Sequence, residues 1–117
     1  MLTVEIDPRV PPSRRRILKA LAERLARAAR LTNDLTIHFV RADEISTGTG
    51  VDDQGYAVFC EGINQILIAL GEEEYFPWAT VADHLAHELG HYCQWRDGRA
   101  YHEAGATRRG RNFLKRD

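Results

Sequence analysis

Two histidines and a glutamate in the C-terminal half of the chain have a spacing that could do metal chemistry. His87 and His91 are four residues apart, and Glu88 follows the first of them. Residues four apart on an α-helix lie on one face, so both imidazoles could direct a nitrogen lone pair at the same metal ion. A zinc ion with three protein ligands keeps a fourth position for water and lowers the pKa of that water, and a neighbouring carboxylate can take the proton. The spacing therefore predicts hydrolytic chemistry, with Glu88 beside the metal rather than bound to it.

A helix must carry these side chains, and the surrounding residues predict one. Apolar residues recur at helical spacing and make one stripe: Trp78, Val81, Leu85, Leu89 and Tyr92. At about 100° per residue, the two histidines fall beside this stripe, and Glu88 lies between them and its centre. We therefore expect the site at the edge of the core. A helical His-Glu-x-x-His is also the pattern of zinc peptidases.

A third metal ligand is needed, because two histidines do not complete a catalytic zinc site. Metzincins place it in the continuation His-Glu-x-x-His-x-x-Gly-x-x-His. Here Gln94 stands where that glycine should be and Asp97 where that histidine should be, so the chain departs from the metzincin pattern. Asp97 also belongs to the turn directly after the motif helix, which is an awkward position for a ligand. The remaining candidates are His102 and Glu103, near the start of the next predicted helix.

Two further helices are predicted, one before and one after the motif helix in the sequence. Residues 14–30 follow Ser13, which is a plausible N-cap. The apolar stripe of this helix consists of Ile17, Leu18, Leu21, Leu25 and Ala28. Residues 102–115 predict a final helix despite two glycines, with Ala106, Phe113 and Leu114 facing inward. Both helices are rich in Lys and Arg, which we interpret as solvated faces. Because the net charge of the chain is −1, we do not expect nucleic-acid binding.

Four stretches predict the strands of a small mixed sheet. Residues 2–6 and 35–40 alternate apolar and polar side chains and could pair, while residues 56–60 and 65–70 bracket the turn 61–64 as a hairpin. Residues 41–55 are rich in Asp, Ser, Thr and Gly and predict a loop. One hairpin strand could be an exposed edge that binds an extended peptide as an added strand. An edge without function is the open alternative.

Length and composition bound the remaining possibilities. With 117 residues, 44% of them hydrophobic, the chain fits one domain over residues 1–117 with a single modest core. The first residues lack a basic start and a long apolar run, so we expect no signal peptide, and no stretch is long enough to cross a bilayer. Cys60 and Cys93 are too few for a disulfide framework and are expected to be free buried thiols. We therefore expect a cytoplasmic protein, and a monomer.

The residues between Leu85 and Leu114 resemble one group of zinc peptidases. They read His87-Glu88-Leu89-Gly90-His91-Tyr92, then Gln94-Trp95, a glycine-containing turn, and a helix that opens Glu103-Ala104-Gly105-Ala106. This order resembles small gluzincin-like proteins of bacteria and phages, and above all the single-domain minigluzincins. The resemblance implies an α+β, zincin-like fold: an N-terminal helix, a small sheet with an exposed edge strand, and two site helices.

The same resemblance implies zinc-dependent hydrolysis of peptide bonds. Zn²⁺ would be held by His87, His91 and Glu103, and Glu88 would take the proton of the attacking water. The substrate would be a peptide or protein bound along the edge strand. A competing resemblance is to SprT-like proteases, whose third ligand is a histidine where His102 stands.

The sequence leaves two alternative functions open. Gluzincins often have an acidic residue where Thr107 stands, and its absence favours a regulatory or interaction module that binds zinc without turnover. A DNA-associated protease of the SprT-like kind is the other alternative. Tyr92, Tyr101 or His102 could hydrogen-bond the oxyanion of the reaction, and the sequence does not choose among them.

Overall fold

The computed structural model describes residues 1–41, 57–70 and 78–115. The predicted loop at 41–55 lies outside the described residues except for its first position, as does the predicted strand position 56. Seven elements follow one another in the described chain: β1 (Leu2–Ile6), α1 (Pro12–Ala29), β2 (Leu35–Arg41), β3 (Ala57–Cys60), β4 (Gln65–Leu70), α2 (Trp78–Arg96) and α3 (Glu103–Lys115). The described residues therefore form a small α+β arrangement, and all four predicted strands are present.

The four strands form one mixed sheet in the order β1-β2-β4-β3. β1 and β2 are parallel neighbours joined through α1, and β2 is also parallel to β4. β3 and β4 are antiparallel and form the predicted hairpin, with Val58 opposite Leu67. Because β3 pairs with β4 alone in the described part of the chain, the hairpin contributes one edge of the sheet, as the sequence suggested.

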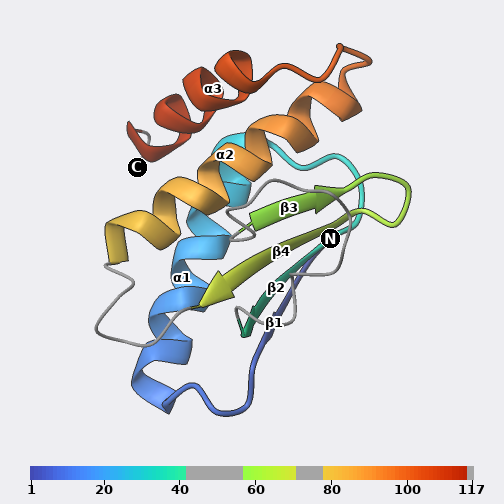
Figure 1. The fold of residues 1–117 in the computed structure, drawn as a ribbon. Coiled ribbons are helices and arrows are strands. Elements are labelled where there is room, and N and C mark those ends of the chain that lie inside the picture. The colour runs from blue at the N-terminus through green and yellow to red at the C-terminus, as the bar shows by residue number, and fades with distance from the viewer. Residues whose placement is uncertain (42–56, 71–77, 116–117) are drawn as a thin grey trace.

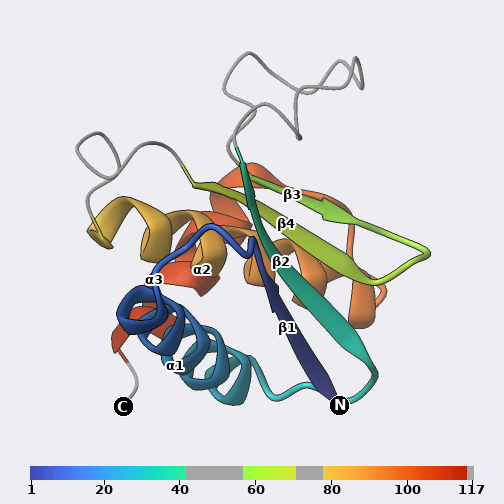
Figure 2. The same ribbon diagram turned by 90° about the horizontal axis from the view of Figure 1, so that it is seen from below.

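One face of the sheet holds the core. α1 and α2 lie on this face, and α3 runs back along α2 (Figures 1 and 2). Alternate residues of the two central strands face the helices and are fully or almost fully buried: Leu35, Ile37, Phe39, Ile66 and Ile68. The inward-facing residues of β2 pack in this layer with the apolar stripe of α2. The buried residues of that stripe are Val81, Leu85, Leu89 and Tyr92. Burial of this stripe fixes which side of α2 is left for the histidines.

Helix α1 differs from the prediction at two positions. The helix begins at Pro12, and its N-cap is Pro11 without a side-chain cap, so the prediction that Ser13 caps it is wrong. Proline suits the first helical turn because its missing N–H would have had no partner there. Ile17, predicted to face inward, is 50% exposed, whereas Leu18, Leu21 and Leu25 are buried as expected.

Two glycines let α3 lie unusually close to α2. Gly90 of α2 is opposite Ala106, and Gly110 of α3 is opposite Ala86. A Cβ atom at Gly110 would lie 2.9 Å from the Ala86 carbonyl carbon and 3.1 Å from the His87 backbone nitrogen. Gly90 and Gly110 therefore allow the backbones of the two site helices to touch, and Gly110 is one of the two glycines that counted against the final helix in the sequence.

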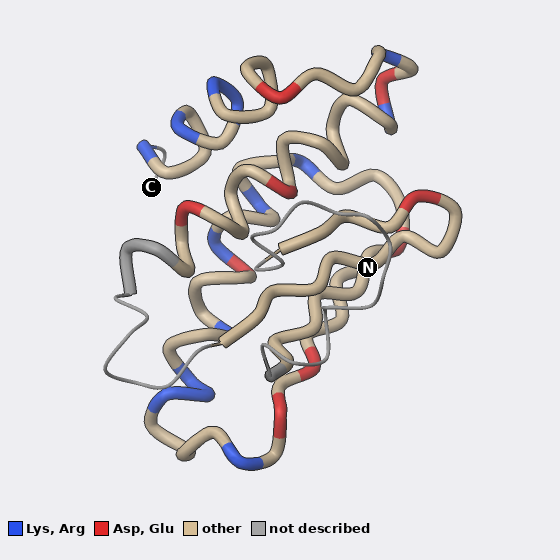
Figure 3. The backbone as a smooth tube through the Cα atoms, in the orientation of Figure 1, with Lys and Arg blue, Asp and Glu red and all other residues tan. Residues whose placement is uncertain are grey.

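Most of the described Lys and Arg residues belong to helices α1 and α3 (Figure 3). Several of them are exposed on both helices: Arg16, Lys19, Arg27, Arg108, Arg111 and Lys115. This exposure agrees with the interpretation that they are solvated helix faces. Among the described helices, none is long and apolar enough to cross a membrane.

Candidate metal centre

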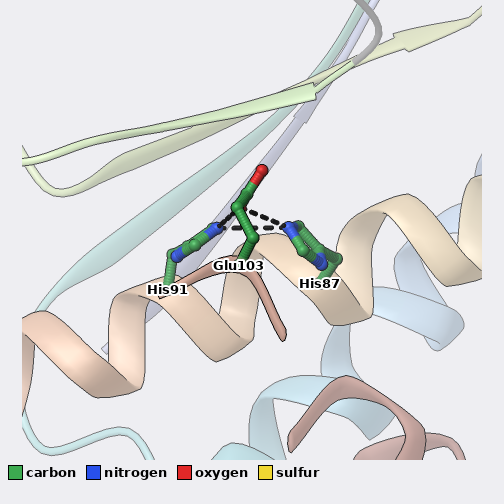
Figure 4. A group of neighbouring side chains, drawn as sticks. All are labelled: His87, His91 and Glu103. Carbon is green, nitrogen blue, oxygen red and sulfur yellow. Dashed lines mark hydrogen bonds and ion pairs between the residues drawn. The ribbon is translucent and has the colours of Figure 1, made fainter. Parts of the chain in front are cut away.

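The side chains of His87, His91 and Glu103 converge on one point (Figure 4). Nε2 of His87 lies 3.1 Å from Nε2 of His91, and Oε1 of Glu103 lies 3.1 Å from the first nitrogen and 2.5 Å from the second. The histidines come from adjacent turns of α2, and Glu103 is the first residue of α3. Among the described residues, this is the group of His, Cys, Asp and Glu side chains with the spacing of a metal site.

The chain reverses between α2 and α3 in a way that delivers Glu103 to the histidines. The end of α2 is closed by backbone hydrogen bonds, in which the N–H of Asp97 donates to Cys93 O and the N–H of Arg99 donates to Gln94 O at 2.8 Å. On the other side of the turn, Arg109 of α3 reaches back to Asp97, with 3.2 Å between Nη1 and Oδ2. These contacts close the end of α2, and the pair of Asp97 and Arg109 joins it to the second turn of α3.

The second ring nitrogen of His87 is held by Thr107. Nδ1 of His87 lies 3.1 Å from Thr107 Oγ1. Thr107 is one turn after Glu103 on α3, which is where gluzincins often supply an acidic residue. A metal-binding histidine is usually held by a hydrogen bond on its other nitrogen, because that bond fixes the orientation of the ring. The hydroxyl of Thr107 therefore lies where a hydrogen-bond partner of His87 is needed, but it carries no charge.

His91 is held in the same way by a residue that the sequence analysis did not assign. Nδ1 of His91 lies 3.0 Å from Gln94 Oε1, and both side chains are buried. In the sequence, Gln94 stood out only as a departure from the metzincin pattern. The spacing i, i+3 on a helix was the available signal, since it places the two side chains side by side.

The structure separates the two candidates for the third ligand. His102 lies one residue before α3, and its Nδ1 accepts a hydrogen bond of 2.9 Å from the Gly105 N–H. This contact satisfies a backbone donor at the start of the helix, which is the work of an N-cap side chain. The prediction that α3 begins at His102 is thus one residue early. Glu103, rather than His102, joins the two histidines in the described cluster.

Glu88 lies on the inner flank of the site. It is buried, with 9% of its surface exposed. Burial raises the pKa of the Cys60 thiol at the end of β3, and the charge of Glu88 raises that pKa further. Cys60 and Cys93 are both free thiols, as expected, but only Cys93 is buried, and Cys60 is partly exposed.

The three oxyanion candidates occupy very different places. Tyr92 is fully buried, its hydroxyl donates to Asn33 Oδ1, and its ring is perpendicular to the Phe59 ring, so it belongs to the core and not to the candidate centre. His102 caps α3. Tyr101 is 68% exposed and stacks on His91, with ring centroids 3.9 Å apart and planes within 2°. Tyr101 is therefore the aromatic residue beside the candidate centre.

The two histidines stabilise the negative charge of Glu103. Burial acts to raise the pKa of Glu103, but hydrogen bonds from His91 and His87 outweigh it and leave this pKa below its usual value. An ionised carboxylate oxygen 2.5 Å from an imidazole nitrogen is stable only with a proton or a metal ion between or beside the two atoms. Two imidazoles and one carboxylate are also a donor set of catalytic zinc sites.

Comparisons with protein-family models, with curated proteins and with solved structures found no match to this chain. The similarity to gluzincins therefore stays a prediction from the residues of the two site helices.

Proposed function

We propose that this chain is a zinc-dependent metallopeptidase, in which His87, His91 and Glu103 hold the metal and Glu88 is the general base. The observation that carries the proposal is the convergence of two Nε2 atoms and one carboxylate oxygen from two helices, within 4.8 Å of one another. Zinc ligands at about 2.0–2.1 Å in a tetrahedral arrangement are about 3.3 Å apart. Two of the three separations are 3.1 Å, so small side-chain rotations fit the cluster to the ion.

The roles of the residues follow from their positions. When bound, Zn²⁺ would supply Lewis acidity that activates a water molecule and polarises a carbonyl group. Glu88 accepts the proton of the attacking water and returns it to the leaving amine, because it is next to His87 in the chain but outside the cluster of three. Tyr101 packs flat on His91 and keeps water from that face of the ring.

A substrate strand fits this arrangement. β3 is at the edge of the sheet and packs beside α2, so an extended peptide added to β3 would lie near the helix that carries His87, Glu88 and His91. Backbone hydrogen bonds to an edge strand give affinity without demanding one sequence. We therefore infer a peptide or an unfolded protein segment as the substrate class.

The proposal is tested by measuring zinc content and peptide cleavage on the same samples. The purified chain should bind one zinc ion, cleave an unfolded protein substrate, lose this activity with a chelator and regain it with zinc. Glu88→Gln should bind zinc as the parent does and cleave nothing, whereas His91→Ala should lose the metal. Cleavage by Glu88→Gln at the parent rate, or a parent chain without zinc, would overturn the proposal.

A zinc-binding module without turnover is the second candidate, and one observation favours it. Thr107 offers His87 a neutral hydroxyl, which leaves the imidazole less electron-rich than a carboxylate partner would. The same samples separate the two functions, because this alternative predicts bound zinc and no cleavage in the parent chain.

A further inference from the structure

Gln94 lies where α2, the turn and α3 meet, and its side-chain amide joins all three. Its Oε1 lies 3.0 Å from His91 Nδ1 and accepts a hydrogen bond of 3.1 Å from the His102 backbone N–H. Its Nε2 donates to the His102 carbonyl oxygen at 2.9 Å. The side chain is buried, with 5% of the residue exposed. One amide group therefore contacts a histidine of the candidate centre and the residue directly before Glu103.

The backbone of His102 fixes which end of the amide faces His91. A backbone N–H can only donate and a carbonyl oxygen can only accept, so the Gln94 oxygen must meet the first and the nitrogen the second. Turning the amide over would place its NH₂ group against the His102 N–H and its oxygen against the His102 carbonyl oxygen. A donor would then face a donor, and an acceptor would face an acceptor. The atom of Gln94 that faces His91 is therefore an acceptor, and the Nδ1 atom of His91 must carry the proton of that hydrogen bond.

This orientation has a consequence for the other ring nitrogen. A neutral imidazole carries one proton, so a proton on Nδ1 leaves Nε2 of His91 with a lone pair for a metal ion in the cluster. Without a metal ion, the 2.5 Å contact between Nε2 and Glu103 Oε1 needs a second proton on the ring. Thr107 imposes no such choice on His87, because a hydroxyl can both donate and accept. The partner of His91 thus selects one tautomer, whereas the partner of His87 accepts either.

We propose that Gln94 is a positioning residue, which presets His91 in the Nδ1–H tautomer and ties this histidine to the start of α3. The role of Gln94 in metal binding rests on the proposed function, whereas its contacts with His91 and His102 do not depend on it. Because Gln94 holds His102 at both backbone polar groups, it sets the position of Glu103 relative to His91. Preorganisation of this kind lowers the cost of metal binding, since one ligand tautomer and one ligand position are already selected.

A glycine in α3 leaves the room that this contact needs. A Cβ atom at Gly105 would lie 2.9 Å from Gln94 Nε2 and 3.1 Å from His102 Nδ1. Any side chain at this position would push the amide away from the His102 backbone or displace the cap of α3. The Gly105 position, which costs helix stability, is therefore explained by the amide contact.

The first test reads the tautomer directly in the metal-free parent chain. Long-range ¹H–¹⁵N NMR at alkaline pH distinguishes a proton on Nδ1 from one on Nε2. We expect a proton on Nδ1 of His91, whether or not Nε2 carries one as well. A His91 ring protonated on Nε2 alone in the folded parent would overturn the proposal, whatever the chain does with zinc or peptides, so this result is independent of the proposed function.

The second test uses three variants and measures zinc affinity by competition with a chelator. Gln94→Leu removes every polar contact and should weaken zinc binding by about 10–100-fold and abolish the tautomer preference. Gln94→Glu keeps acceptor oxygens for His91 and the His102 N–H, so it should restore the Nδ1–H form and recover part of the affinity. Thr107→Val is the matched control, because it removes the contact to the other histidine and should leave the His91 tautomer unchanged.

These outcomes separate a positioning role from a purely structural one. Far-ultraviolet circular dichroism establishes whether each variant is folded. Folded Gln94→Leu with the parent tautomer and parent zinc affinity would contradict the proposal. If this variant does not fold, Gln94→Glu decides, since a merely structural amide would not return His91 to the Nδ1–H form.

Discussion

Gly90 and Ala106 bring the two site helices into backbone contact. A Cβ atom at Gly90 would lie 2.5 Å from the Ala106 carbonyl oxygen and 2.9 Å from its Cα. Ala106 is one turn after Glu103, and Gly90 directly precedes His91, so this close approach of α2 and α3 is next to the cluster. The position of the third candidate ligand therefore depends on the absence of one side chain.

Gly90→Ala should disturb both the fold and the metal site. The added methyl meets backbone atoms, which cannot turn away as a flexible side chain would, so α3 must shift. Overpacking of this kind typically costs about 1–3 kcal/mol. We expect a decrease of that size in the free energy of unfolding, measured by urea denaturation, and zinc affinity at least about tenfold lower. Ala104→Ser, on the exposed side of α3, is the control and should change neither value.

The third ligand is decided by paired variants of neighbouring residues. Glu103→Gln removes the negative charge from the cluster and should weaken zinc binding by more than about 100-fold, beyond what loss of a supporting contact does. His102→Asn should keep zinc, because asparagine is a good N-cap and can replace the contact to Gly105. Chelator competition measures both. The reverse pattern, with zinc lost in His102→Asn and kept in Glu103→Gln, would favour the SprT-like ligand set.

The helical part of the site could be predicted from the sequence because it is local. A four-residue spacing puts His87 and His91 on one face wherever the helix lies, and the apolar stripe places that face at the core. The role of Gln94 was not predictable in this way. Its partner, the His102 backbone, is brought back by a turn whose path no local pattern specifies.

The closeness of the helices was also hidden in the sequence. Gly110 counted against the final helix in the sequence, and only the packing of α3 on α2 explains why Gly90 and Gly110 are glycines. The prediction of a Ser13 cap was wrong for a local reason, because the helix already begins at Pro12. Strand alternation predicted the inward residues of β2, whereas the strand order β1-β2-β4-β3 required the structure.

The contact between α2 and α3 predicts a dependence of stability on pH. A hydrogen bond from Arg96 lowers the pKa of Asp97, burial opposes this, and Arg109 lowers the pKa further. Since the folded pKa lies below the usual 3.8, the stabilisation is present above pH 3.8 and is lost as the pH falls through the folded value. The pair is partly exposed, so Asp97→Asn should cost about 0.2–1 kcal/mol at neutral pH.

Urea denaturation of parent and Asp97→Asn at several pH values measures this contribution. The two unfolding free energies should differ at neutral pH and approach each other once the parent carboxyl is protonated. A constant difference down to the most acidic folded condition would mean that the charge of Asp97 is not what stabilises the contact with Arg96 and Arg109.

The edge strand β3 predicts a pattern of backbone recognition in the substrate. A peptide that adds to a sheet edge bonds through the N–H and C=O groups of alternate residues, while the residues between them point their backbone groups away. N-methylation of single peptide bonds, moved one residue at a time along a cleaved peptide, should therefore raise KM at every second position. The intervening positions are the internal control and should match the unmodified peptide. Equal effects at all positions, or none at any, would show that the peptide is not bound as a strand on β3.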